Sequence, residues 1–399
     1  MELRKDFKSS EVGQIPSDWK LMVLVDLAEI RSGIAKNSNA AITNPVFVHY
    51  LRVANVQDGF LDLTEMSQLQ VNRDDIKRYA VLPGDMLMNE GGDLDKLGRG
   101  ALWSGEFSPC VHQNHVFVVR CGSSLLPAYL KAWTGSTAAR KYFLLAGRQT
   151  TNLASINKTS LGLLPVPLPS SRAEQEAIAE ALSDADALIE SLDQLIAKKR
   201  LIKQGAMQEL LAGKRRLPGF SGAWVVKRLG EVANIKTGGR NNQDKVEDGA
   251  YPFFVRSSTV ERINSFSHDC EAILIPGEGG IGSIFHYIFG KFDVHQRVYA
   301  ITRFTSETSG KFIYFYMATK FGAHAMENSV KATVDSLRLS TFLDFEITMP
   351  PTLAEQTAIA TVLSDMDTEL AALEVRLAKA QQIKQGMMQE LLTGRIRLL

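Results

Sequence analysis

Side chains that could read DNA bases gather in short polar runs of the chain. Arg, Lys, Asn, Gln and Thr carry the hydrogen-bond donors and acceptors that match base edges in the major groove. The run Arg148–Asn152 supplies such residues without an apolar anchor, and the glycine-rich loop Gly91–Gly100 could bring two cations close to phosphates. These runs predict DNA contacts, although a solvated loop and a structural glycine turn explain the same patterns; the residues are Lys96, Arg99, Arg148, Gln149, Thr150, Thr151 and Asn152.

Similar runs occur in the second half of the chain. Gly239–Gln243 and Arg256–Ser258 are rich in donors, and Lys331–Val334 aligns with the run that begins at Arg148. The same reasoning predicts a second set of DNA contacts, which consists of Arg240, Asn241, Asn242, Arg256, Lys331 and Thr333.

Patterns for other chemistries are incomplete. Asn44–Phe47 lacks the second proline of the amino-methyltransferase motif, and Glu278–Gly282 lacks the Lys-Ser/Thr pair of a phosphate-binding loop. A zinc site would be expected to show CxxC pairs, which are missing from the only Cys/His group: Cys110, His112, His115 and Cys121. The sequence therefore predicts no metal site, no catalytic residue and no cofactor in this chain.

Composition indicates an ordinary globular protein of two or three domains. The chain has 399 residues, of which 45% are hydrophobic, and its formal net charge is +1. Three cysteines and the charged start Met1–Lys8 favour a reducing cytoplasm over secretion, and no apolar run is long enough for a membrane span. A protein that held DNA alone through phosphates would be more basic, so we expect any DNA affinity to depend on partner subunits.

The chain is internally duplicated. AEQEAIAEALSDAD at Ala173–Asp186 and AEQTAIATVLSDMD at Ala354–Asp367 share ten of fourteen positions. KQGAMQELLAG at Lys203–Gly213 and KQGMMQELLTG at Lys384–Gly394 share nine of eleven at the same offset of 181. The segments that precede these motifs share only a sparse skeleton, which includes the pairs Trp19/Trp224, Gly33/Gly238 and His112-Gln113/His295-Gln296. The order is therefore variable segment, repeated segment, variable segment, repeated segment.

Each repeated segment is predicted to form one long helix. Ser171 with Glu174, and Thr352 with Glu355, fit the capping-box pattern, and Gly213 and Gly394 are expected stops. Apolar residues recur in steps of four and three, which is the spacing of a heptad seam that packs against another helix. The predicted pairing residues are Ile178, Leu182, Ala185, Ile189, Leu192, Ile196, Ile359, Leu363, Met366, Leu370, Leu373 and Leu377.

The variable segments are predicted to be mixed α/β with short strands. Helices are expected at Pro127–Thr134 and Gly310–Thr319. Strands are expected at Val46–Val53, Asp85–Asn89, Val111–Arg120, Ala272–Ile275 and Val294–Arg303. The predicted fold is α+β, with two mixed α/β domains (1–170 and 214–350) separated by two long helices (171–213 and 351–399) that form an antiparallel coiled coil with pseudo-twofold symmetry.

These motifs resemble the DNA specificity subunit of type I restriction–modification systems. The AEQ-x-AIA…LSD and KQG-x-MQELL-x-G motifs and the duplication carry the resemblance across essentially the whole chain. In the first domain YLRVANVQDG, NEGGDLDKLGRG and HQNHVF add to it, whereas the second domain retains only IPGEGGIG in the corresponding region. The resemblance also points to His112, Gln113 and Asn114, and to His295, Gln296 and Arg297, as DNA contacts.

The resemblance implies a non-catalytic subunit in which each domain reads one half of an interrupted double-stranded DNA site. Its partners would be two methyltransferase subunits, which bind S-adenosylmethionine, and restriction/translocase subunits, which use ATP and Mg. The assembled complex would then act as a DNA adenine methyltransferase and a site-specific endonuclease.

Other classes of protein remain open from the residues alone. A stand-alone DNA methyltransferase or nuclease would need motifs that are missing, and a coiled-coil scaffold would bind proteins without DNA. A free-standing regulator would need tighter DNA binding than the net charge of +1 suggests. Methyl transfer by the isolated chain, or DNA binding in the presence of a methyltransferase partner, distinguishes these alternatives.

Overall fold

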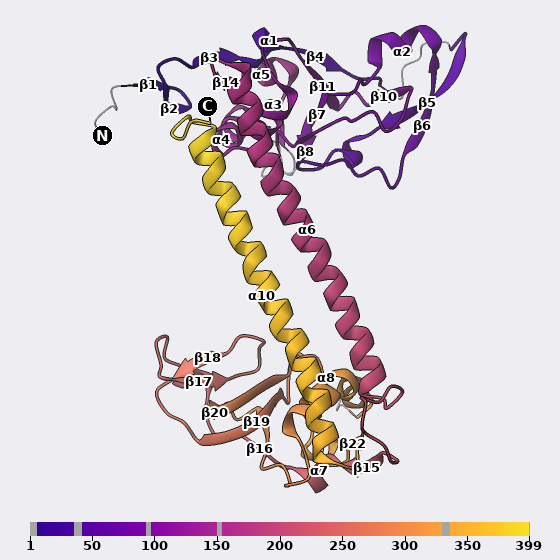
Figure 1. Cartoon of the computed structure of the whole chain (residues 1–399), viewed down its shortest axis with the longest axis vertical. Helices are drawn as coiled ribbons and strands as arrows, with labels where there is room; N and C mark the ends of the chain where they lie inside the picture. Colours follow the sequence, from indigo (N-terminus) through magenta and orange to yellow (C-terminus); the bar gives the residue numbers. More distant parts are fainter. Residues whose placement is uncertain (1–5, 36–41, 93–96, 150–153, 329–335, 399) are drawn as a thin grey trace. The chain divides into compact units, whose positions relative to one another are not determined.

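A computed structural model describes residues 6–35, 42–92, 97–149, 154–328 and 336–398 (Figure 1). The chain divides into two compact units. Unit 1 consists of Met1–Ser191 with Leu377–Leu399, and unit 2 consists of Leu192–Arg376. Both units combine helices with small sheets, so the prediction of a mixed helix–sheet protein is confirmed.

Unit 1 is built on several small sheets. The largest has the order β4-β11-β7-β9, and a second has the order β10-β5-β6, in which β10 and β5 are parallel. The strands are β1 (Phe7–Ser10), β2 (Gly13–Pro16), β3 (Lys20–Val23), β4 (Ala28–Ser32), β5 (Pro45–Leu51), β6 (Ser67–Asn72), β7 (Met86–Asn89), β8 (Gly91–Gly92), β9 (Gly100–Leu102), β10 (Cys110–His112), β11 (Val116–Cys121), β12 (Arg148–Gln149), β13 (Ala154–Ser155) and β14 (Pro165–Leu168). The helices are α1 (Leu24–Leu27), α2 (Arg73–Tyr79), α3 (Pro127–Thr134), α4 (Thr137–Ala146), α5 (Lys158–Gly162) and the start of α6 (Arg172–Leu210).

Unit 2 repeats this plan with longer strands. Its six-stranded sheet has the order β16-β21-β19-β20-β17-β18, in which only β20 and β17 are parallel, and β15 pairs with β22. The strands are β15 (Val225–Arg228), β16 (Asn234–Thr237), β17 (Tyr251–Phe254), β18 (Glu261–Ile263), β19 (His268–Pro276), β20 (His286–Val294), β21 (Val298–Thr302) and β22 (Glu346–Met349). The helices are α7 (Leu229–Val232), α8 (Gly310–Glu327), α9 (Leu339–Leu343) and α10 (Leu353–Leu391).

The strand orders of the two units correspond. β4, β11 and β7 in unit 1 match β16, β21 and β19 in unit 2, while β9 and β10 are both replaced by the single long strand β20. The connections around β6 are longer in unit 1 (52–66 and 73–85) than around β18 in unit 2 (255–260 and 264–267). Unit 2 is therefore the shorter copy mainly because these two connections are short.

Two predicted strands are wrong in one respect. Val111–Arg120 is interrupted by a turn between β10 and β11, and Val294–Arg303 is interrupted by a turn between β20 and β21. Val116 N–H donates to the Gln113 carbonyl and Val298 N–H donates to the His295 carbonyl, so the chain turns at the His-Gln pair in both units. Apolar residues continue on both sides of each turn, so the sequence predicts one strand where the structure has two. The predicted helix Pro127–Thr134 is confirmed as α3, and the other extends further as α8.

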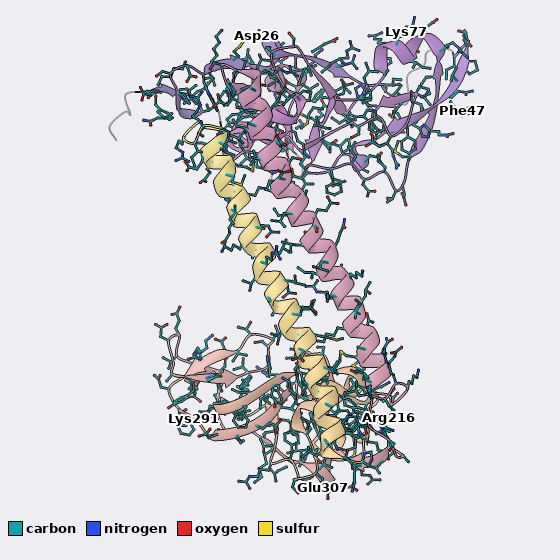
Figure 2. All side chains as sticks on the ribbon, in the orientation of Figure 1. Asp26, Phe47, Lys77, Arg216, Lys291 and Glu307 are labelled. Atoms are coloured by element: carbon teal, nitrogen blue, oxygen red, sulfur yellow. The ribbon has the colours of Figure 1, made fainter. Side chains whose placement is uncertain are left out.

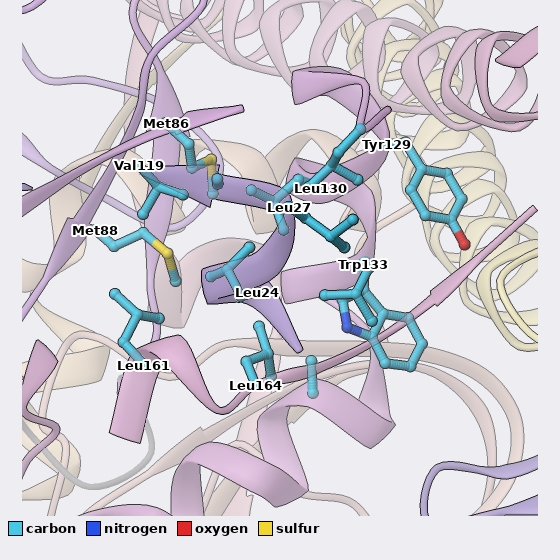
Figure 3. Packing of buried hydrophobic residues seen from close by; sticks show 14 of the residues in the cluster. Leu24, Leu27, Met86, Met88, Val119, Tyr129, Leu130, Trp133, Leu161 and Leu164 are labelled. Atoms are coloured by element: carbon cyan, nitrogen blue, oxygen red, sulfur yellow. The ribbon is translucent and has the colours of Figure 1, made fainter. Parts of the chain in front are cut away.

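The core of unit 1 draws residues from distant parts of the sequence (Figure 3). Leu24 and Leu27 of α1 pack with Met86, Met88 and Val119 of the sheet, and Trp133 of α3 closes the cluster. Tyr129 and Trp133 are fully buried, but the Tyr129 hydroxyl and the Trp133 indole N–H donate to the carbonyls of Pro167 and Pro165. These bonds remove the cost of burying the two polar atoms and tie α3 to β14.

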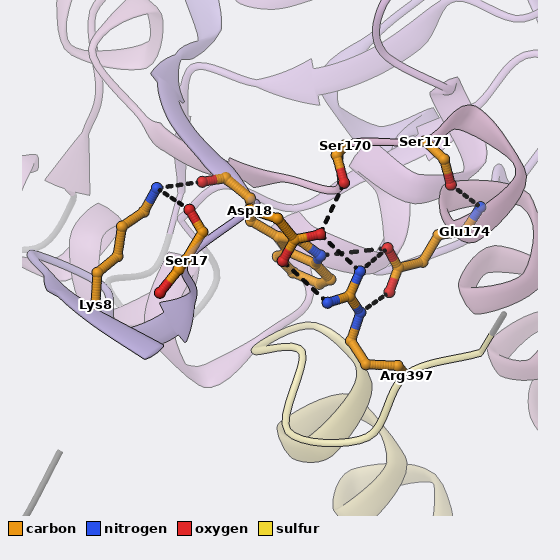
Figure 4. Close-up of polar contacts among 8 residues, drawn as sticks. Lys8, Ser17, Asp18, Ser170, Ser171, Glu174 and Arg397 are labelled. Carbon is orange, nitrogen blue, oxygen red and sulfur yellow. Dashed lines mark hydrogen bonds and ion pairs between the residues drawn. The ribbon is translucent and has the colours of Figure 1, made fainter. Parts of the chain in front are cut away.

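Each long helix begins at an arginine–glutamate contact, and Figure 4 shows the one at the start of α6. Glu174, which is 1% exposed, accepts hydrogen bonds from Arg397, and that arginine also pairs with Asp18 (3.0 Å). The Ser171 hydroxyl accepts from the Glu174 N–H, so the first half of the predicted capping box is present. The Glu174 carboxylate is instead directed to Arg397 and to the Trp19 indole N–H (3.3 Å).

Unit 2 contains the same contact with different residues. Glu355 is 1% exposed and accepts from both ends of the Arg216 guanidinium (2.5 and 2.7 Å), and the Thr352 hydroxyl accepts from the Glu355 N–H. In both units the arginine comes from the segment that follows the other long helix. Figure 2 labels Arg216 and draws the side chains of the described residues.

α6 and α10 run antiparallel within each unit. In unit 1 Lys384 pairs with Asp186 (2.5 Å), and in unit 2 the equivalent Lys203 pairs with Asp367. All twelve predicted seam residues are buried or partly buried. The seam residues nearest the helix starts also belong to the core of their own unit. Ile178 and Leu182 pack there with Leu391 and Leu392 in unit 1, and Ile359 and Leu363 pack with Leu210 and Leu211 in unit 2. The arrangement of the seam as a coiled coil stays a prediction.

Glycines at the end and in the middle of the helices behave differently. Gly213 and Gly394 both have a φ of +65° just after the last turn, as expected for helix stops. Gly205 and Gly386 lie inside the helices, where glycine costs about 1 kcal/mol relative to alanine. A Cβ added at either would meet no atom within 4 Å, so close packing between the two helices does not explain them.

Replacing Leu182 by alanine should destabilise unit 1. Leu182 is 3% exposed and belongs to the core cluster, so we expect Leu182→Ala to lower the free energy of unfolding by about 2–5 kcal/mol. The matched control is Leu145→Ala on α4, because Leu145 is 78% exposed and should change stability by less than about 0.5 kcal/mol. Urea unfolding followed by tryptophan fluorescence measures both; equal midpoints for the two variants would contradict the packing described.

Candidate nucleic-acid interface

Unit 2 brings most of its predicted DNA contacts together around one turn. The turn 295–297 joins β20 to β21 and lies beside Arg240, with which His295 forms an isolated parallel bridge. The Gln296 N–H donates to the Arg240 carbonyl (2.8 Å), and the Gln296 amide donates to the Asn241 side-chain oxygen. Two segments that are far apart in the sequence therefore present their polar side chains on one surface.

A buried carboxylate holds the first arginine of this surface. Asp293 is 1% exposed, and its oxygens accept from Arg240 Nε (3.2 Å), Ser265 Oγ (2.8 Å), Ser267 Oγ (2.8 Å) and the Val294 N–H (3.0 Å). Burial alone would raise the pKa of Asp293, but these hydrogen bonds hold it below its ordinary value. Because Arg240 is held through Nε, no other described residue takes up its two terminal amino groups, which can therefore donate to a ligand.

A second carboxylate lies between two more arginines. Glu278 pairs with Arg256 (3.4 Å) and with Arg297 (3.1 Å), both of which are more than half exposed. An acidic group in this position orients both guanidinium groups and partly cancels their charge. The surface of unit 2 is therefore a set of oriented donors with little net charge.

Unit 1 has a corresponding turn after β10. His115 in this turn pairs with Glu90 (2.6 Å), and the Asn114 amide lies 3.2 Å from the other ring nitrogen of His115. Gln113 accepts from the Val53 N–H (3.3 Å). A polar cavity of about 350 Å³ opens beside the turn and is lined by Tyr50, Arg52, Ser67, Gln68 and Gln113.

The two predicted histidines are buried beneath these turns. His112 is 0% exposed and His295 is 5% exposed, so their positions favour holding the turn over contacting a ligand. The His112 Nδ1–H donates to the Val116 carbonyl (2.6 Å), and burial lowers the pKa of His112 to about 4. Burial also lowers the pKa of His295, and the positive charges of Arg256 and Arg297 add to this.

Of the remaining predicted contacts, Arg99, Arg148 and Asn242 form no side-chain hydrogen bond to either turn within the described residues. Arg99 is partly buried beside the end of β7, where its carbonyl accepts from the Asn89 N–H, and Arg148 is exposed in β12. Asn242 is exposed near Arg240. Gln149 is the second residue of β12. The described residues do not include the other predicted contacts, which are Lys96, Thr150, Thr151, Asn152, Lys331 and Thr333.

Several polar residues at these sites were missed by the sequence analysis. They are Tyr50, Arg52, Ser67 and Gln68 around the cavity, together with the carboxylates Glu90, Glu278 and Asp293. The expected strand Val46–Val53 enclosed Arg52, whereas β5 ends at Leu51. A strand end placed at Leu51 would have pointed to Arg52, because loop residues next to regular elements often carry function. The carboxylates gave no such signal, since they act on arginines distant in the sequence.

The described ranges hold no assembled metal site and no activated thiol. No three or more His, Cys, Asp or Glu side chains come together there in a way that could hold a metal ion. Burial raises the pKa of the Cys110 and Cys121 thiols to about 12, which keeps both protonated. Among the helices described, none has the length and apolar content to cross a membrane.

Comparison with known proteins identifies the family. The model of the type I restriction modification DNA specificity domain matches residues 16–198 and again residues 222–385. The chain therefore belongs to the family of type I restriction–modification DNA specificity proteins.

Individual relatives agree with this assignment. A candidate type I restriction enzyme MjaX specificity subunit of Methanocaldococcus jannaschii is 25% identical, over 99% of this chain and 97% of that protein. The EcoDI specificity subunit of Escherichia coli is 33% identical over 162 residues, which are 41% of this chain and 34% of that protein. The crystal structure of the S subunit from M. genitalium has a similar fold (TM-score 0.66, 15% identity, 98% of both chains).

The burial of His112 should make stability depend on pH. The Val116 carbonyl can only accept, so His112 carries its proton on Nδ1, and Nε2 is buried without a partner among the described residues. The folded pKa of about 4 lies below the unfolded value of 6.5, so stability present above pH 6.5 is lost as the pH falls toward 4. The full loss amounts to about 3 kcal/mol.

Urea midpoints between pH 7 and pH 4.5 test this expectation. The variant His112→Asn retains an amide that can donate to the Val116 carbonyl but does not titrate, so its midpoint should fall less steeply than that of the wild type. An identical pH dependence in the two proteins would show that His112 is not buried as described.

Proposed function

We propose that this chain reads a bipartite, interrupted DNA target for a type I restriction–modification complex. In this proposal the surface at the turn 113–115 reads one half of the site and the surface at the turn 295–297 reads the other. The chain supplies no catalytic group. Methyl transfer and cleavage belong to partner subunits, together with S-adenosylmethionine, ATP and Mg.

The observation that carries the proposal is a repeated fold with different side chains at its exposed turns. Both units place a His-Gln pair at the end of a parallel strand, with the histidine buried and the glutamine partly exposed in unit 1 and exposed in unit 2. Around this pair unit 1 presents Asn114 and His115, while unit 2 presents Arg297 and Asn241. A shared frame with different donors is what two readers of different half-sites require.

The long helices are proposed to set the half-site separation and to carry the methyltransferase subunits. Their antiparallel contacts within each unit and the motifs repeated near both of their ends support a paired, coiled-coil arrangement that offers two similar surfaces. The open space at Gly205 and Gly386 would allow close approach by another subunit. In this proposal two methyltransferase subunits dock on these surfaces, and restriction subunits join the complex.

Methylation-sensitive long-read sequencing tests the proposed function. Cells that express the chain with its methyltransferase partner should methylate one motif made of two short half-sites with a fixed spacer. Cells with the partner alone should not methylate that motif. A continuous motif, or the same methylation without this chain, would contradict the proposal, and methyl transfer by the purified chain alone would favour the methyltransferase alternative.

Lengthening the helices should lengthen the spacer. Seven residues inserted after Ser191 and seven at the equivalent position after Ala372 keep the heptad spacing and add about 10 Å to each helix. We expect both half-sites to be retained and the spacer to increase by about three base pairs, at 3.4 Å per base pair. Insertion in one helix alone is the control and should abolish methylation. An unchanged spacer in the double insertion would show that the helices do not set the separation.

A further inference from the structure

An arginine occupies the same structural position in both units. In unit 1 His49 is paired with Cys110 across two parallel strands, and in unit 2 Phe253 is paired with Asp293 in the same way. Three residues further along the first strand of each pair lie Arg52 and Arg256. Three residues further along the second strand lie Gln113 and Gln296. The sequences around the two arginines differ, so only the strand register reveals that the positions are equivalent.

The backbone that carries Arg52 is fixed by side-chain amides. The Arg52 N–H donates to Asn55 Oδ1 (2.9 Å), and the Val53 N–H donates to Gln113 Oε1 (3.3 Å). The buried Asn89 donates to the carbonyls of Val53 (3.2 Å) and Val56 (2.9 Å). A side chain on such a turn is held in place before a ligand arrives, which favours selective recognition.

The Arg52 guanidinium is only partly satisfied. Its Nη2 donates to the Glu65 carbonyl (3.0 Å), while Nε is buried and no group within the described ranges accepts from it. Arg52 lines the cavity of about 350 Å³ together with Tyr50, Ser67, Gln68 and Gln113. Every one of these side chains can form hydrogen bonds, so the cavity matches the edge of a polar, flat ligand better than an apolar one.

Arg256 is oriented by a different device. Glu278 holds one end of its guanidinium (3.4 Å), and half of the Arg256 side chain remains exposed. The carboxylate also holds Arg297 (3.1 Å), so the two arginines lie on either side of Glu278. The second unit therefore presents its equivalent arginine at the surface with a fixed direction.

We propose that Arg52 and Arg256 are the equivalent base-reading residues of the two units, and that each contacts a guanine in its own half-site. This inference rests on the proposed function. Guanine presents two acceptors, N7 and O6, in the major groove, and the fork of an arginine matches both. Lysine is a weaker substitute in such a contact, because its ammonium is a compact point charge without the planar, two-pronged donor set of arginine.

The test uses the complete complex of this chain with its methyltransferase partner. Duplex libraries randomised at one half-site at a time are methylated and sequenced. Arg52→Ala should relax the preference at one position of one half-site by roughly ten- to a hundredfold and leave the other half-site unchanged. Arg256→Ala should do the same in the other half-site, and neither variant should alter the spacer.

Matched controls are Arg73→Ala in unit 1 and Arg228→Ala in unit 2, because both arginines are exposed outside the clusters described. Both control variants should retain the wild-type preference. Arg52→Lys provides a second variant should Arg52→Ala fail to fold. It should relax the same position while the thermal midpoint of the complex stays close to that of the wild type.

Three results would overturn the inference. The first is an unchanged preference at both half-sites in Arg52→Ala and Arg256→Ala, while the wild-type complex still methylates a bipartite motif. The second is uniform weakening for all sequences with a salt slope smaller by about one, which would indicate contact with a phosphate. The third is a wild-type complex without any bipartite preference, which would also refute the proposed function.

Discussion

Each unit depends on one buried carboxylate and the arginine that neutralises it. Glu174 and Glu355 are both 1% exposed, and removing the partner of such a group would leave an uncompensated charge at a cost of about 3–5 kcal/mol. The partners, Arg397 and Arg216, come from the segments that follow the other long helix, and each lies over a tryptophan of its own unit, Trp19 or Trp224. In each unit the buried glutamate therefore lacks its partner unless the segment that follows the other long helix packs against the globular part.

This requirement explains why the helix starts are nearly identical while the turns that are proposed to read DNA are not. The glutamine after each buried glutamate is also held by backbone hydrogen bonds. Gln175 donates to the Ser124 carbonyl and accepts from the Leu126 N–H, and Gln356 donates to the Glu307 carbonyl and accepts from the Ser309 N–H. Backbone groups have the same chemistry in both units, so the Glu-Gln motif that hydrogen-bonds to them can be the same in both units. The exposed turns face solvent, where the fold constrains the side chains much less.

The parts of the fold that could be predicted are those in which local spacing and packing agree. The helix at Pro127–Thr134 and both long helices follow directly from caps and apolar periodicity. The turns at Gln113 and Gln296 were missed because apolar residues continue on both sides of them. The equivalence of Arg52 and Arg256 could not be predicted from the sequence for another reason. It depends on the register of parallel strands, and that register relates residues about sixty positions apart in unit 1 and forty in unit 2.

The carboxylates beside the arginines bear on how a nearly neutral chain could select DNA. With a formal net charge of +1, and with Asp293 and Glu278 placed against Arg240, Arg256 and Arg297, long-range attraction to phosphates is weak. The same carboxylates fix the direction of each guanidinium, which is the property that distinguishes one base edge from another. Affinity that comes from phosphates adds equally to every sequence, so a reader that leaves most of it to partner subunits retains its selectivity. The acidic residues on these surfaces are thus consistent with base reading, since they weaken the attraction to phosphates but fix the direction of the guanidinium groups.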